Sequence, residues 1–87
     1  QQKFDQMAAK IMADPEHYLT FDSVSDFYKA AWLDEFPQGT RWSATGLDDG
    51  AEQFYAVIEY GDHYLYISRM ERVTVKLGIR HHYNRNN

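Results

Sequence analysis

The sequence lacks cysteine, contains only two prolines and has no long apolar run. Without cysteine the chain forms neither a disulfide nor a thiolate metal site, and this composition fits a reducing compartment. No segment approaches the about 18 apolar residues of a membrane-spanning helix, and the N-terminus shows no signal-peptide pattern. We therefore expect a soluble, cytoplasmic protein with no membrane association.

Basic residues are scarce in the first part of the chain and concentrated near its end. Residues 1–62 carry a net charge of −8 and residues 63–87 carry +4, which gives the total of −4. This split indicates an acidic body with a basic end. The two ends could also simply attract one another within the fold, because isolated surface charges contribute little.

Glycine-rich phosphate loops are absent, because the five glycines are scattered turn residues. We therefore expect no cofactor. The 87 residues leave room for one core, and 44% hydrophobic with 16% aromatic residues exceeds what disordered chains carry. We predict a single domain over residues 1–87.

Two segments near the N-terminus have the apolar spacing of amphipathic helices. The first helix is predicted over about residues 2–14, and Pro15 ends it. The second is predicted over about 22–36 and begins at Asp22 or Ser23, either of which can cap its free N–H groups. Its apolar stripe is Val24, Phe27, Tyr28, Ala31 and Trp32.

A β-hairpin centred on Gly61-Asp62 organises the rest of the chain. The flanking runs, 52–60 and 63–69, are rich in aromatic and β-branched residues, and the Gly-Asp pair suits a two-residue turn. Such a turn pairs Tyr60 with His63 and Ile58 with Leu65. Because side chains alternate along a strand, one face of the hairpin is then aliphatic. The other face carries Tyr55, Val57, Glu59, Tyr64, Tyr66 and Ser68.

Two further strands are predicted, at about 40–46 and 73–78. A three-residue loop before the last strand keeps Val75 and Leu77 on the aliphatic face, and we prefer it to a two-residue turn, which would place polar groups there. The first strand is ambiguous, since an even loop length places Trp42 on the tyrosine face and an odd one places it in the core. Residues 83–87 are predicted to form a flexible tail.

The predicted fold class is α+β: two N-terminal helices packed on one face of a four-stranded antiparallel meander sheet. Two helices cover such a sheet once, which leaves the tyrosine face open. We predict a partner-binding surface there, formed by Tyr55, Val57, Tyr64, Tyr66 and Trp42. The expected function is a small non-enzymatic protein-binding module, which acts by self-association as a homodimer or as an adaptor or inhibitor of a larger protein.

Two other function classes compete with protein binding. A single-stranded nucleic-acid binder would stack bases on the tyrosines and hold phosphates with a basic patch of Arg69, Arg72, Lys76 and Arg80. The acidic composition opposes this second choice. A small hydrolytic or metal-dependent enzyme would use His81 and His82. Adjacent residues on an extended segment point to opposite sides, so we predict neither a metal site nor catalytic residues.

Overall fold

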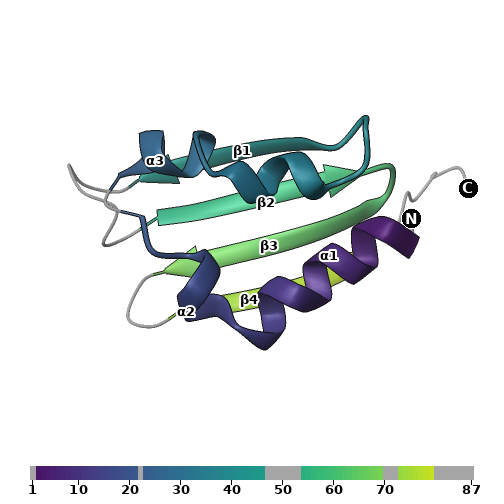
Figure 1. Cartoon of the computed structure of the whole chain (residues 1–87), viewed down its shortest axis with the longest axis horizontal. Coiled ribbons are helices and arrows are strands. Elements are labelled where there is room, and N and C mark those ends of the chain that lie inside the picture. The colour runs from purple at the N-terminus through teal and green to yellow at the C-terminus, as the bar shows by residue number, and fades with distance from the viewer. Residues whose placement is uncertain (1, 22, 47–53, 70–72, 80–87) are drawn as a thin grey trace, which may run out of the picture.

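The computed structural model describes residues 2–21, 23–46, 54–69 and 73–79. Four helical segments come first: α1 (Gln2–Ala13), α2 (Pro15–Tyr18), α3 (Val24–Tyr28) and the 3-10 helix η1 (Ala31–Glu35). Four strands follow: β1 (Arg41–Gly46), β2 (Phe54–Tyr60), β3 (His63–Arg69) and β4 (Val73–Ile79). The strands form one antiparallel sheet in the order β1-β2-β3-β4. The predicted α+β fold class is therefore confirmed (Figure 1).

The first predicted helix is present as α1, one residue shorter than expected. Its inward stripe is Phe4, Met7, Ala8 and Ile11, all buried. Met12 follows Ile11 at the edge of this stripe but is 44% exposed. Pro15 does end α1, and it also begins α2, because proline is favoured at the first position of a helix.

The continuous helix predicted over 22–36 is wrong. Ser23 caps α3 by accepting a hydrogen bond from the Asp26 N–H at 3.2 Å, but the helix ends at Tyr28, and Ala30 is extended before η1 begins. A continuous helix would turn Leu33 and Phe36 away from its own apolar stripe. The break instead allows both to enter the core, where they are 2% and 5% exposed. Burial of these two side chains outweighs local helix propensity.

The central hairpin has the predicted register. Tyr60 pairs with His63 and Ile58 with Leu65. Gly61 has a φ of 62° and Asp62 has no positive φ, which is the pattern of a type II′ turn. The predicted register of the fourth strand is also confirmed, because Ile67 pairs with Val75 and Leu65 with Leu77. Residues 70–72, which carry the predicted loop, lie outside the described residues.

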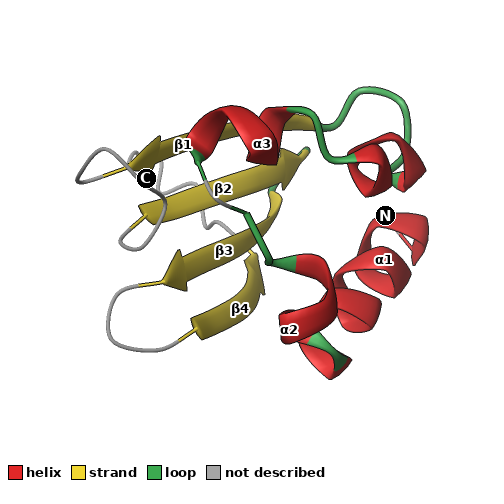
Figure 2. Ribbon diagram, turned by 60° about the vertical axis from the view of Figure 1, so that its left-hand side comes forward, coloured by secondary structure: helices red, strands yellow, loops and turns green. Residues whose placement is uncertain are grey.

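The described helical segments all lie on one side of the sheet (Figures 1 and 2). In Figure 1 α1 lies over β4, while α3 lies beside β1. The core forms between this helical layer and the inward side chains of the two central strands, which are Phe54, Ala56, Ile58, Leu65 and Ile67. Leu19 and Phe21, which lie in the segment between α2 and α3, are buried in the same core. None of the described helices is long and apolar enough to cross a membrane.

Candidate functional site

The face of the sheet opposite the described helices is made of three rows of side chains, which the strand register defines. We call this surface the open face. Along each row, from β1 to β4, residues lie directly opposite one another. The rows are Arg41-Glu59-Tyr64-Gly78, Ser43-Val57-Tyr66-Lys76 and Thr45-Tyr55-Ser68-Thr74.

Four of the five residues predicted to bind a partner lie together on this open face. Val57 is directly opposite Tyr66 in the middle row, and Tyr64 and Tyr55 lie in the rows on either side. Tyr55 is 40% exposed, while the other three are half-buried. The result is a contiguous apolar and aromatic strip over β2 and β3 with hydroxyl groups along it.

The ring of Tyr64 lies across the neighbouring strand rather than standing away from the sheet. A Cβ atom added to Gly78 would come within 2.6 Å of the ring and the hydroxyl oxygen of Tyr64. Glycine at position 78 therefore leaves the space that this ring occupies. Tyr64 contributes to the packing of β3 on β4 as well as to the open face, so it is a poor choice for a substitution meant to spare the fold.

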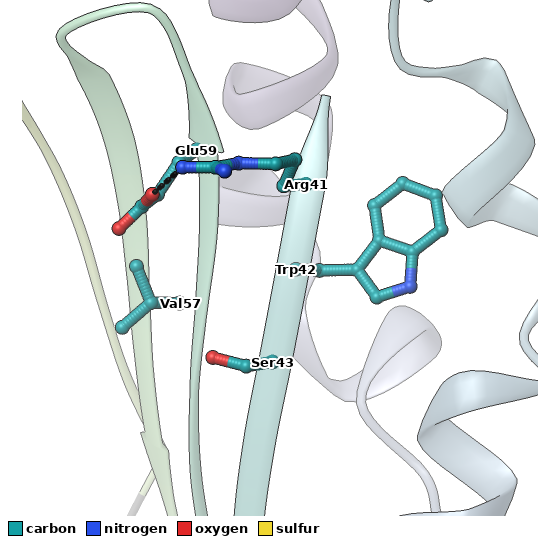
Figure 3. Close-up of a pocket in the computed structure, with 5 residues that line it drawn as sticks. All are labelled: Arg41, Trp42, Ser43, Val57 and Glu59. Atoms are coloured by element: carbon teal, nitrogen blue, oxygen red, sulfur yellow. Dashed lines mark ion pairs between the residues drawn. The ribbon is translucent and has the colours of Figure 1, made fainter. Parts of the chain in front are cut away.

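A shallow hollow of about 320 Å³ lies beside the tyrosine strip, over β1 and β2 (Figure 3). It is lined by Arg41, Ser43, Val57 and Glu59, and also by Trp42, although the Trp42 side chain points to the other side of β1. Arg41 and Glu59 form an ion pair at 3.6 Å across its end, drawn as a dashed line in Figure 3. The hollow exists because the side chains of Ser43 and Val57 are short, while those of Arg41 and Glu59 beside them are long. It makes the open face concave at this point.

Trp42 does not belong to the tyrosine surface. It pairs with Ile58, whose side chain is fully buried, and its side chain packs against the core while remaining half-exposed. In Figure 3 it points to the other side of β1 from Ser43 and Val57. Gly46 pairs with Phe54, so an odd number of residues separates these two partners. An odd connection places Trp42 on the core face, and its assignment to the open face is wrong.

The predicted basic patch is not one surface. The Arg69 guanidinium lies on the helix side, where it donates hydrogen bonds of 2.8 Å each to the carbonyl oxygens of Leu19 and Phe21. It also lies over the Phe54 ring at 5.3 Å. Lys76 is exposed on the open face, directly opposite Tyr66. Arg69 and Lys76 therefore face opposite sides of the sheet, and Arg72 and Arg80 lie outside the described residues.

A histidine–carboxylate pair is present that the sequence did not reveal. Nδ1 of His63 lies 3.1 Å from Oδ1 of Asp5, so the start of β3 is tied to α1. Fifty-eight positions separate the two residues, and no spacing motif links them. Within the described ranges, no group of three or more His, Asp or Glu side chains could hold a metal ion. His81 and His82 lie outside those ranges.

No protein-family model, no curated protein and no solved structure matches this chain.

Proposed function

We propose that this protein is a small non-enzymatic protein-binding module that uses the open face of its sheet. The observation that carries the proposal is the strip of Tyr55, Val57, Tyr64 and Tyr66 on the side of the sheet that the described helices leave uncovered. An antiparallel sheet face exposed to water normally alternates to polar side chains. An aromatic strip of this kind instead has the composition of a contact surface.

The chemistry of the strip supports a protein partner. Tyrosine offers a broad apolar ring and a hydroxyl group while losing little conformational freedom on binding, which is why it is common at the centre of interfaces. The adjoining hollow and the Arg41–Glu59 ion pair add a concave, polar margin to that centre. An apolar centre with a polar rim is the usual anatomy of a protein interface.

Nucleic acid is the second choice of partner, and three features count against it. Arg69, which would have held a phosphate, instead binds backbone carbonyls on the far side of the sheet. On the open face, Arg41 is paired with Glu59, and the chain as a whole carries a net charge of −4. Phosphate binding depends on concentrated positive charge.

The non-enzymatic part of the proposal rests on where the acid–base groups lie. The His63–Asp5 pair joins α1 to the helix side of the sheet. The tyrosine strip lies on the opposite side, so a molecule bound there does not meet this pair. An open and nearly flat surface also lacks the enclosure that catalytic sites use to exclude water.

The test compares immobilised wild type with a Tyr55→Ser, Tyr66→Ser double variant in capture of partners from host extract. Both rings lie on the open face, so the variant should fold and lose capture, since tyrosines at the hot spot of an interface are typically worth about 2 kcal/mol or more each. Met12→Ser is the matched control, because Met12 is an exposed apolar residue on α1. It should capture as the wild type does.

Two further readings of the same experiment separate the alternatives. Light scattering at several concentrations shows whether the partner is a second copy, which the double variant should then fail to bind. Binding to nucleic acid would weaken steeply with salt and disappear after nuclease treatment. If the double variant captures partners as well as the wild type does, the open face is not the binding surface.

A further inference from the structure

β4 is an edge strand whose outward backbone groups can be identified from one hydrogen bond at the other edge. The Ala44 N–H of β1 donates to the Tyr28 hydroxyl at 2.8 Å, so the backbone groups of Ala44 face away from β2. In antiparallel pairs the residues alternate between facing one neighbour and facing the other. The register carries this alternation across the sheet to β4. There the backbone N–H and C=O groups of Thr74 and Lys76 face β3, and those of Val75 and Leu77 face outward.

The two edges of the sheet differ in how they are protected. At β1 the Tyr28 side chain occupies the middle of the edge through its bond to Ala44. At β4, none of the hydrogen bonds between elements in the described part of the chain reaches the outward groups. A strand edge whose outward backbone groups carry no such bond is a template for pairing with another strand.

Apolar side chains and a hollow accompany this edge. Leu77 and Ile79 are 38% and 53% exposed. They line a hollow of about 390 Å³ together with Gly78, Asp5 and His63. Recognition of an extended peptide uses both features at once: backbone bonds along an edge supply affinity, and pockets for alternate side chains supply specificity.

We propose that the β4 edge binds an extended peptide segment of a partner protein as a fifth, antiparallel strand. The peptide carries apolar residues at alternate positions, opposite Val75, Leu77 and Ile79. Those beside Leu77 and Ile79 reach the hollow. The peptide residue opposite Lys76 lies on the open face and is acidic, because directly opposed residues interact across strands. This edge is separate from the tyrosine strip, so the proposal does not depend on the proposed function.

Lys76 also argues against a second copy of the chain as the occupant. Two copies of β4 that pair over their full length about a two-fold axis place Lys76 opposite Lys76, since position 76 is the centre of Val73–Ile79. Like charges directly opposite one another destabilise a strand pair, and lysine on an edge is a common defence against self-pairing. An acidic residue of a bound peptide would instead lie opposite Lys76, and the two opposite charges attract one another.

The probe is an acetylated, amidated seven-residue peptide in which valine alternates with glutamate, labelled with fluorescein for anisotropy. One control peptide carries N-methyl groups on the amides that would pair with β4, and a second has lysine in place of glutamate. The methylated peptide should bind at least about tenfold more weakly, because it loses two backbone hydrogen bonds. The lysine peptide should bind several-fold more weakly.

Variants and amide exchange complete the test. Lys76 is exposed, so Lys76→Glu should fold and should reverse the preference between the glutamate and lysine peptides. Bound peptide should slow amide exchange at Val75 and Leu77, while Thr74 and Lys76 are already protected by β3. The proposal is overturned if no peptide binds, if methylation has no effect, if protection falls on β1, or if raised protein concentration alone protects Val75 and Leu77.

Discussion

Arg69 connects the end of β3 to the chain segment that follows α2. Its guanidinium donates to the carbonyl oxygens of Leu19 and Phe21, two residues whose side chains are themselves buried. Arg69→Met keeps the apolar stem but leaves both carbonyls without this donor. We expect the free energy of unfolding to fall by about 1–3 kcal/mol, as measured by urea denaturation.

The control for Arg69 is Lys76→Met, which removes an equal charge from the open face. This change should alter stability by no more than about 0.5 kcal/mol, since Lys76 is exposed. Equal, small effects of both substitutions would show that the Arg69 contacts do not stabilise the fold. These contacts could not be predicted from the sequence, because a lone arginine at a strand end looks the same whether it binds carbonyls or faces water.

At the scale of elements, the edge of β1 depends on one hydroxyl group of α3. Tyr28→Phe removes the acceptor for the Ala44 N–H and retains the ring. We expect faster amide exchange at Ala44 and a loss of about 0.5–1.5 kcal/mol of stability. Tyr55→Phe, which removes a hydroxyl group from the open face, should leave exchange at Ala44 unchanged. If amide exchange at Ala44 is equally fast in Tyr28→Phe and in the wild type, the Tyr28 hydroxyl does not protect the Ala44 N–H.

The elements differ in how far the sequence determines them. The hairpin from Phe54 to Arg69 was predictable with its register, because its turn and its side-chain alternation are local. The helix predicted over 22–36 was not, because the break at Ala30 is set by the burial of Leu33 and Phe36. Trp42 was misplaced for a similar reason, since its face depends on pairing with β2 across a long connection.

For the whole molecule, the two faces of the sheet should differ in their effect on stability. Ile58 and Leu65 are fully buried between the sheet and the helices. Replacement of either by alanine should cost about 2–5 kcal/mol. Val57 is next to Ile58 in β2 but lies on the open face, and Val57→Ala should cost about 1 kcal/mol or less. Thermal unfolding of the three variants checks this order, and a larger loss at Val57 would mean that the open face is covered.

The arrangement of layers could be predicted from the sequence, because the apolar faces of the helices and the aliphatic face of the sheet must cover one another. The tyrosine strip followed from the same periodicity, and four of its five expected members share one face. Contacts between distant parts of the chain did not follow. The His63–Asp5 pair and the Arg69 bonds join residues that are 48 to 58 positions apart, and only the folded chain brings them together.

Hydroxyl-radical footprinting of the protein with and without its captured partner tests the central claim most directly. Tyr55 and Tyr66 report on the open face, while Met12 and Tyr28 are exposed on α1 and α3. If the partner binds the open face, labelling of Tyr55 and Tyr66 falls several-fold in the complex, and labelling of Met12 and Tyr28 does not change. Protection of Met12 and Tyr28 with unchanged labelling of Tyr55 and Tyr66 would place the partner on the helices and contradict the account.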